Sequence, residues 1–354
     1  MNDLNPVSSE GFLSRRIFLG SLGALLLTCQ LFGNEPQSGD VPATAIHHVR
    51  IRVSDLDRSL EWYQGLFGMP IVARHGDRAI LRVGEGPQFL EMVGGSDAKP
   101  GIVGLGLSTD DFDPDRVLGI LKARGVTPAQ DPGPMKVQVE DRDEEPGGVA
   151  DGAPEVIFGD PDGIVLQLQD SSFSGGVGPL GNEHPKAPEP APTEGLLAVQ
   201  DFNHITMFVS DQKRSVAFYR ELFRMPVDTY QGALPILRVG AGNQFLALVS
   251  SPRLRSPAFI HHACFTVKDF DPDRILKGLA EYGVTPRGDK RKQAGPLRSY
   301  VTMRMPDRGG APEGTPELYL TDPDGILLQI QDLRYAGGSG YLGNERGKPR
   351  DAPK

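Results

Sequence analysis

Alternating apolar and polar residues mark the strands of this chain, and apolar residues three or four positions apart mark its helices. The stretch HVRIRV, which begins at His48, alternates and predicts a strand. After Asp55, a residue suited to the start of a helix, the apolar positions within 60–67 follow the helical spacing. The stretches AILRV and FLEMV come next, joined by a turn with Gly and Pro, and predict two antiparallel strands.

The same order of elements then occurs again. A strand-like stretch, GLGLST, begins at Gly104, and the helical stretch DPDRVLGILKARG begins at Asp113. The final strand-like stretch, IVLQLQ, begins at Ile164. The pattern therefore predicts two units, each of one strand, one helix and about three strands.

This whole pattern is present twice. The segment HVRIRVSDLDRSLEWYQGLFGMP from His48 aligns without gaps with HITMFVSDQKRSVAFYRELFRMP from His204, 156 residues later. The motif DPDG at Asp160, just before the last strand, recurs 162 residues later at Asp322. A match of this length indicates an internal repeat. We call the two halves copy one and copy two.

The segments outside the repeat have a different composition. Residues 184–200 contain the Pro-rich stretch HPKAPEPAPTEG and predict an extended linker. The polar tail, 346–354, is expected to be disordered. The predicted domains are therefore 46–183 and 201–345.

Composition excludes several classes of protein. With 38% hydrophobic and 23% charged residues, the chain has the composition of a soluble globular protein. Its 46 acidic and 37 basic residues give a net charge of -9, and no long Lys/Arg run is present, which argues against a nucleic-acid partner. The two cysteines are too few for a disulfide framework or a Cys-rich zinc site.

The first 45 residues read as an export signal with its lead-in. The pair Arg15 and Arg16 precedes an apolar stretch too short to span a bilayer, and it resembles the twin-arginine export motif. A periplasmic or otherwise extracytoplasmic protein, with no membrane span in the mature chain, is expected. Lipid anchoring at Cys29 and cleavage at the small residues 43–45 are both open, and we expect removal of residues 1–45 to leave the fold intact.

The first-strand His, the VSD motif and the DPDG motif, in this order of elements, resemble the vicinal oxygen chelate superfamily. That superfamily contains glyoxalases, bleomycin resistance proteins and extradiol dioxygenases. The resemblance covers about 46–170 and 202–332 and implies an α+β fold of tandem βαβββ modules. Each pair of modules would form a cup-shaped mixed β-sheet around a divalent metal. The motifs are more specific for this fold than for one activity.

The resemblance also implies a set of metal ligands, because the superfamily takes them from the first and last strands of the modules. In copy two these positions fall on His204, His262 and Gln329, with Ala247 at the fourth position. Two imidazoles and one oxygen make the three-point face of an open catalytic metal site. The usual family residue at the position of Gln329 is glutamate, while members of the glyoxalase branch use glutamine.

In copy one the same positions fall on His48, Glu91 and Gln167, and Gly104 takes the fourth. The neighbouring His47 is expected to point to the opposite face of the sheet. Both sets also have a purely structural interpretation. In that interpretation the histidines are satisfied core residues, and the glutamines are polar side chains lining an empty cup.

Tyr319 lies ten residues before Gln329, the separation at which extradiol dioxygenases place an active-site tyrosine. The resemblance therefore implies a catalytic role for Tyr319, and a packing aromatic is the alternative. The acid-base histidine of those enzymes would fall at Ala247, where no imidazole is present. His261 is close in sequence but is expected to face away from His262.

Three functions follow from these residues. The first is a metal-dependent enzyme, dioxygenase-like or glyoxalase/epimerase-like, that acts on a small oxygen-rich molecule in the cup of copy two. Its metal would be Fe²⁺ or Mn²⁺, with Zn²⁺ or Ni²⁺ as alternatives. The second is a metal-free protein that sequesters a small molecule, as bleomycin resistance proteins do. The third is a structural module, and self-association into a homo-oligomer stays open for all three.

Overall fold

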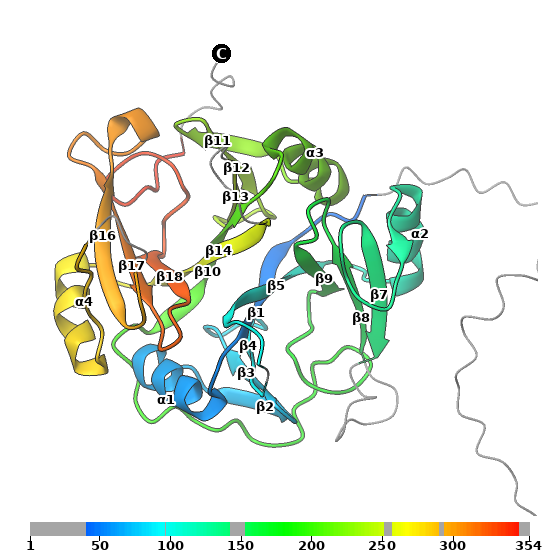
Figure 1. The fold of residues 1–354 in the computed structure, drawn as a ribbon, viewed down its shortest axis with the longest axis horizontal. Coiled ribbons are helices and arrows are strands. Elements are labelled where there is room, and N and C mark those ends of the chain that lie inside the picture. Colours follow the sequence, from blue (N-terminus) through cyan, green and yellow to red (C-terminus); the bar gives the residue numbers. More distant parts are fainter. Residues whose placement is uncertain (1–39, 96, 142–152, 251–256, 290–293, 347–354) are drawn as a thin grey trace, which may run out of the picture. The chain divides into compact units, whose positions relative to one another are not determined.

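The structure is a computed structural model that describes residues 40–95, 97–141, 153–250, 257–289 and 294–346. The Arg15–Arg16 pair, Cys29 and the tail 347–354 lie outside the described residues. The described residues from Asp40 onward form one compact unit. Within that unit each copy of the repeat contributes one nine-stranded sheet (Figure 1).

The elements of copy one follow the predicted order of strand, helix and strands, twice over. They are β1 (Ala45–Arg52), α1 (Leu56–Phe67), β2 (Ile71–His75), β3 (Arg78–Arg82), β4 (Phe89–Val93), β5 (Gly101–Thr109), α2 (Pro114–Ala123), β6 (Thr127–Pro128), β7 (Lys136–Asp141), β8 (Pro154–Gly159) and β9 (Val165–Asp170). The strand order in the sheet is β2-β3-β4-β1-β5-β9-β8-β7-β6.

Copy two repeats this topology. Its elements are β10 (Val199–Phe208), α3 (Gln212–Phe223), β11 (Val227–Gln231), β12 (Leu234–Arg238), β13 (Phe245–Val249), β14 (Phe259–Val267), α4 (Pro272–Leu279), the 3₁₀ helix η2 (Ala280–Tyr282), β15 (Thr285–Pro286), β16 (Arg298–Arg304), the 3₁₀ helix η3 (Pro306–Arg308), β17 (Thr315–Thr321) and β18 (Leu327–Asp332). The strand order is β11-β12-β13-β10-β14-β18-β17-β16-β15. The predicted α+β fold of tandem βαβββ modules with mixed sheets is therefore confirmed.

An aspartate begins each of the four α-helices. Asp55, Asp113, Asp211 and Asp271 have extended backbones, and each side chain accepts a hydrogen bond from the main-chain NH three residues later. This bond satisfies one of the NH groups that a helix start leaves without a partner. The helix starts expected from the sequence are confirmed at these residues.

Irregular pairing at the centre of both sheets decides which side chains face the cups. In copy one, Ile46 pairs with Leu107 while His48 pairs with Gly106, so His47 is an extra residue in β1. In copy two, Asn203 is extra in β10 for the same reason, and His261 is extra in β14. Such β-bulges turn a side chain away from the face that strict alternation would give it.

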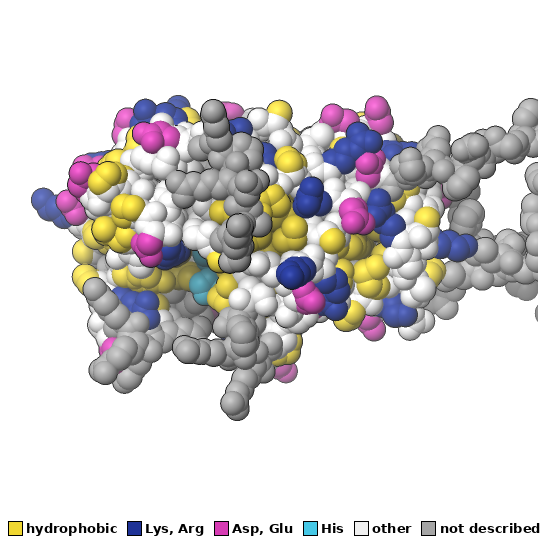
Figure 2. Space-filling model, turned by 90° about the horizontal axis from the view of Figure 1, so that it is seen from above, with side chains coloured by type: hydrophobic (Ala, Val, Ile, Leu, Met, Phe, Trp, Pro, Cys, Tyr) yellow, Lys and Arg dark blue, Asp and Glu magenta, His cyan; other side chains and the backbone are white. Residues whose placement is uncertain are grey.

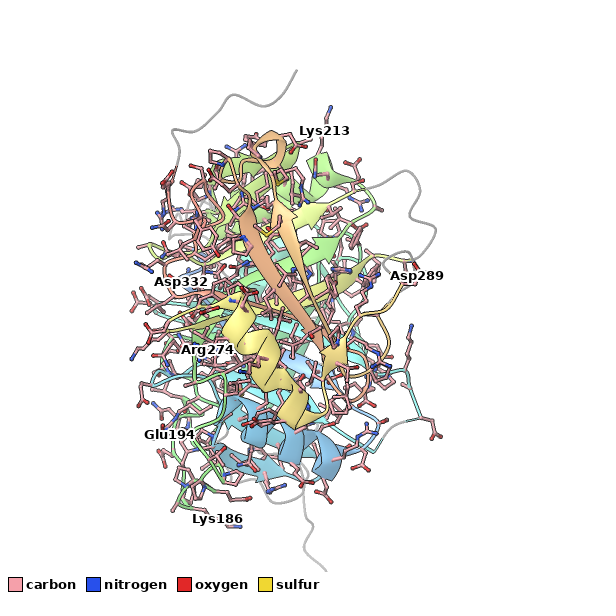
Figure 3. The ribbon with its side chains drawn as sticks, turned by 90° about the vertical axis from the view of Figure 1, so that its left-hand side faces the viewer. Lys186, Glu194, Lys213, Arg274, Asp289 and Asp332 are labelled. Carbon is pink, nitrogen blue, oxygen red and sulfur yellow. The ribbon has the colours of Figure 1, made fainter. Side chains whose placement is uncertain are left out.

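The two copies share a continuous apolar core. One cluster of buried side chains draws residues from both repeats, and the rings of Phe67 and Phe265 lie 5.6 Å apart within it. In Figure 3, α4, which carries Arg274, runs beside β16 and β17 toward α1. There the indole of Trp62 donates to the carbonyl oxygen of Tyr282 over 3.4 Å. The copies are therefore joined by packing as well as by the chain that links them.

The VSD and DPDG motifs bind each other across this interface. The hydroxyl of Tyr63 in α1 donates to Asp322 over 3.2 Å, and that of Tyr219 in α3 donates to Asp160 over 3.0 Å. The second aspartate of each DPDG motif accepts a hydrogen bond from the serine of the other copy's VSD motif. The motifs by which the sequence is recognised thus hold the two copies together.

The lead-in to the first strand is also part of the folded unit. The NH of Val41 donates to the carbonyl of Leu222 over 2.7 Å, and that of Ala43 donates to Phe223 over 3.1 Å. Val41 is fully buried. In copy two the equivalent segment makes the reciprocal contact, from Leu197 NH to Leu66 O at 2.9 Å. These contacts argue against our expectation that residues 1–45 are dispensable for folding, and against cleavage at 43–45.

A truncated protein that starts at Asp40 keeps the whole described lead-in and is the reference for a shorter form. A protein that starts at Ile46 is expected to lose about 2–4 kcal/mol of stability, because it lacks the buried Val41 and several main-chain hydrogen bonds to copy two. Thermal or urea unfolding of the two proteins measures the difference. Equal stability would show that the lead-in contributes nothing to the fold.

Candidate metal centre

Three adjacent strands bring the predicted ligands of copy two together. His204 on β10 and Gln329 on β18 both pair with Cys264 on β14, the strand between them. His204 Nε2 lies 3.1 Å from Gln329 Oε1, and the ring centroids of His204 and His262 are 5.5 Å apart. All three side chains are buried, with 4%, 5% and 1% exposure for His204, His262 and Gln329.

Two neighbours fix the orientation of the His204 ring. Its face stacks on Phe245 with 4.4 Å between ring centroids. Its Nδ1 lies 2.8 Å from Asn203 Oδ1, while the Asn203 amide NH₂ donates to the carbonyl oxygen of Tyr335 over 2.7 Å. Since the amide oxygen can only accept, His204 carries its proton on Nδ1 and directs the lone pair of Nε2 toward Gln329. The Gln329 amide can meet this lone pair with its NH₂ group, or can join it with its oxygen around a cation.

His262 contributes a second imidazole to the same place. Its Nε2 is buried and makes no hydrogen bond of good geometry within the described residues, with the Gln329 amide beside it. Burial lowers the pKa of His204 to about 3 and the pKa of His262 well below its usual value, so both rings are neutral at neutral pH. Neutral imidazole nitrogens with available lone pairs are good ligands for divalent transition metals. The residues present therefore fit a metal ion.

The third ligand would be weaker than the two histidines. Within the described residues, no group of three or more His, Cys, Asp or Glu side chains is placed to hold one ion. The set in copy two is therefore completed only by the amide oxygen of Gln329, which carries no charge. The fourth predicted position, Ala247, is buried in an apolar cluster with Ile236, Phe245 and Tyr335. Among the described side chains, no general base stands at that position.

Tyr319 lies beside the candidate ligands. Its ring meets that of His262 edge to face at 5.5 Å and stacks on Tyr300 at 5.1 Å. Its hydroxyl donates to Glu317 over 3.3 Å, and Glu317 is itself paired with the buried Arg304 at 3.0 Å. Burial raises the pKa of Tyr319 well above its usual value. Tyr319 is therefore held as a neutral hydroxyl that can donate a proton to a hydrogen bond but not act as a base.

A cavity of about 340 Å³ opens next to this cluster and is lined by both copies. Copy one contributes 99–102, and copy two contributes side chains that include His261, Arg287 and Tyr300. On the face of the molecule seen from above, Figure 2 shows a histidine side chain in a hollow bordered by hydrophobic and basic side chains. The predicted ligands lie deeper than this cavity, and His261 stands between it and His262.

His261 does not face away from His262, contrary to our expectation. Their Nδ1 atoms are 2.8 Å apart, because His261 is the extra residue of the bulge in β14. The same correction applies in copy one. His47 Nδ1 lies 3.1 Å from His48 Nδ1, because His47 is the extra residue in β1.

The corresponding site of copy one contains a guanidinium group. Arg50 Nε donates to Glu91 over 2.6 Å, and another Arg50 nitrogen donates to Gln167 over 3.2 Å. His48 Nε2 is 3.2 Å from the same oxygen of Gln167. A second carboxylate, that of Glu155, lies 3.8 Å from Arg50. The three predicted residues of copy one are therefore brought together, but they surround the positively charged guanidinium of Arg50.

Arg50, Asn203 and the role of His261 were not predicted from the sequence. A signal for Arg50 was present, since it follows His48 by two residues and strict alternation places both on one face of β1. Asn203 and His261 had no such signal. Their contacts depend on bulges, which are set by the partner strands.

Comparisons with known proteins agree with this architecture. The family described as the Glyoxalase/Bleomycin resistance protein/Dioxygenase superfamily matches residues 45–168 and 201–330. None of the curated proteins matches the sequence. Over the part of the chain that the structure describes, no helix has the length and apolar character needed to cross a bilayer.

Several solved structures share the fold at low sequence identity. The Mn(II)-bound glyoxalase from Novosphingobium aromaticivorans is 17% identical, with 82% of each chain covered and a TM-score of 0.54. The 2,3-dioxygenase from Pseudomonas sp. KL28 is 15% identical, with 82% of this chain and 93% of that chain covered and a TM-score of 0.56.

A substrate complex is among these structures. Homoprotocatechuate 2,3-dioxygenase from Brevibacterium fuscum, bound to 3,4-dihydroxyphenylacetate, is 16% identical, with 88% of this chain and 87% of that chain covered and a TM-score of 0.55. Likeness at this level of identity concerns the fold and not the activity. Because the family match extends over both sheets, this chain belongs to the Glyoxalase/Bleomycin resistance protein/Dioxygenase superfamily.

Proposed function

We propose that copy two binds one divalent metal ion through His204, His262 and Gln329, and that the protein is a metal-dependent enzyme acting on a small oxygen-rich molecule. The observation that carries the proposal is the buried Nε2 of His262, which makes no hydrogen bond of good geometry within the described residues and lies beside the His204–Gln329 pair. A buried nitrogen of this kind costs free energy unless something binds it. A divalent cation would satisfy it together with its two neighbours.

The choice of metal rests on the ligand set and on the structural neighbours. Two imidazoles with one neutral oxygen suit Fe²⁺ and Mn²⁺, with Zn²⁺ and Ni²⁺ as alternatives. The glyoxalase that shares the fold is Mn(II)-bound. When bound, the ion would act as a Lewis acid on two neighbouring oxygens of the substrate. The Arg15–Arg16 motif supports the further proposal that this activity is exported from the cytoplasm.

The chain's own residues would position the substrate and determine where a proton can be transferred. Asn203 fixes the tautomer of His204, and the cavity lined by both copies would hold a small molecule against His261, whose ring contacts His262. Tyr319, kept protonated by burial, already donates its one hydroxyl hydrogen to Glu317, so it would line the site and not remove a proton. With Ala247 packed among apolar side chains, no imidazole on β13 is available to move a substrate proton. A glyoxalase-like or dioxygenase-like reaction would therefore need another route for that proton.

The wild-type protein is expected to bind one equivalent of Mn²⁺ or Zn²⁺, and His204→Ala is expected to weaken this binding by 100-fold or more. Equilibrium dialysis with metal analysis measures the stoichiometry, and calorimetric titration measures the affinity. His48→Ala in copy one is the matched control and should leave the affinity unchanged. If the wild type binds no metal, a metal-free binding protein becomes the better explanation of the cavity.

A further inference from the structure

We propose that His261 is a positioning residue for the metal site. In this proposal it accepts the Nδ1 proton of His262, so that His262 Nε2 is directed at the ion, and it presents its own Nε2–H to the cavity. The inference rests on the metal site proposed above. It adds the residue that joins that site to the place where substrate would bind.

The geometry comes from the bulge in β14. Thr206 pairs with His262 while the next residue, Met207, pairs with Ile260, so His261 is left without a cross-strand position. Neighbouring residues of a regular strand point to opposite faces. Here the bulge turns the two rings toward each other, and their Nδ1 atoms are 2.8 Å apart. At that distance one Nδ1 donates a hydrogen bond to the other.

The proton positions then follow from the number of protons on a neutral imidazole. Each neutral ring carries one N–H. If His262 binds an ion through Nε2, its proton is on Nδ1 and is donated to His261 Nδ1. The proton of His261 must then be on Nε2, on the far side of the ring. Because His261 lines the cavity, this N–H is a donor for an acceptor oxygen of a bound molecule.

In both copies a bulge residue also lies beside the Nδ1 atom of the first-strand histidine. The bulge residue Asn203 takes the Nδ1 proton of His204 at 2.8 Å, and in copy one the bulge residue His47 lies 3.1 Å from His48 Nδ1. At the position of His261, however, copy one has the bulge residue Val103, next to Gly104. The second orienting residue is thus found only in the copy that has the second histidine.

Aromatic rings hold His261 in place and indicate the kind of molecule it would meet. The rings of Phe208 and Phe259 lie 5.1 and 6.1 Å from its ring. On the cavity wall, the Arg287 guanidinium lies 4.8 Å from the centre of the Tyr300 ring. Flat walls with an imidazole N–H and a guanidinium suit a planar molecule with acceptor oxygens.

The first test measures Zn²⁺ affinity by competition with a chromophoric chelator, so that no activity is needed. His261→Val, which introduces the residue of copy one, is expected to weaken Zn²⁺ binding by about 10- to 100-fold, the usual effect of losing such a partner. His261→Asn is expected to restore affinity close to that of the wild type, because its amide oxygen can accept the proton as Asn203 does for His204. Zn²⁺ binding by His261→Val equal to that of the wild type would overturn the inference.

The second test locates the protons directly. Long-range ¹H–¹⁵N NMR of the Zn²⁺-loaded protein is expected to show His262 protonated at Nδ1 and His261 protonated at Nε2. A His261 ring protonated at Nδ1 would overturn the inference while leaving the metal site intact. A wild-type protein that binds no Zn²⁺ would overturn the metal site itself and this inference with it.

Discussion

Replacing Gln329 with glutamate is expected to strengthen divalent metal binding in copy two by at least ten-fold, or about 1.4 kcal/mol. The Gln329 side-chain oxygen lies 3.1 Å from His204 Nε2, the other proposed ligand atom. The substitution therefore adds a full negative charge to the group that would bind the ion. It also supplies the carboxylate that the site lacks. The change in shape is small, because glutamine and glutamate have nearly the same size.

Without metal the same substitution is expected to lower stability by several kcal/mol. Gln329 is 1% exposed, and a carboxylate there would be buried beside two neutral imidazoles. Thermal unfolding with and without Mn²⁺ should therefore show effects of opposite sign: the variant melts below the wild type when metal-free and gains more than the wild type on addition of metal. A variant that is destabilised equally under both conditions would contradict the metal site.

Gln167→Glu provides the matched control, since Gln167 occupies the same position in copy one. There the added carboxylate would meet Arg50, which already donates to Gln167 over 3.2 Å. We expect little dependence of its stability on Mn²⁺. A metal response in both variants would mean that the added charge, and not the site of copy two, attracts the ion.

Much of the fold could be predicted from the sequence because it depends on local patterns that occur twice. Asp55 and Asp211 start helices because an aspartate side chain can cap the helix it precedes, which needs no information from elsewhere in the chain. The strand positions of His204 and Gln329 likewise follow from alternation and from the repeat. Their choice as ligands came from the family resemblance, and the structure brings the two side chains to 3.1 Å.

The remainder depends on contacts between distant strands. His261 faces His262 because β14 has one more residue than β10 at this point, which forms a bulge. The alternation within β14 alone does not reveal that extra residue. The DPDG motif has a similar difficulty. Asp322 caps its own loop, which is a local role, but it also accepts a hydrogen bond from Tyr63 of the other copy. Such partners become visible only when the two copies are packed together.

The substitution Arg50→Thr is expected to have the largest effect on stability. Arg50 pairs with Glu91, whose side chain is fully buried, and lies 3.8 Å from the nearly buried Glu155. Removing one partner of a buried ion pair leaves a poorly compensated buried charge, at a cost of about 3–5 kcal/mol. Arg78, 3.8 Å from Glu91, would compensate only in part. Urea unfolding of the variant measures the loss.

Metal should offset part of this loss. Copy two has Thr206 at the position of Arg50. Arg50→Thr therefore gives copy one the same small side chain at this position. His48, Glu91 and Gln167 would then face a space without the guanidinium, and Mn²⁺ could bind to the buried carboxylate. We expect the unfolding midpoint of the variant to rise with Mn²⁺ concentration. Arg52→Thr, on the same strand, should show neither the loss nor the recovery.

The reciprocal substitution, Thr206→Arg, tests the same position in copy two. It would place a guanidinium among the candidate ligands of copy two, as Arg50 stands among those of copy one. If a cation of the protein and a metal ion are alternative occupants of the same position, Thr206→Arg abolishes metal binding in copy two, and Arg50→Thr creates a site in copy one. Unchanged metal binding by Thr206→Arg would show that the ion, where it binds, does not lie at the position the repeat predicts.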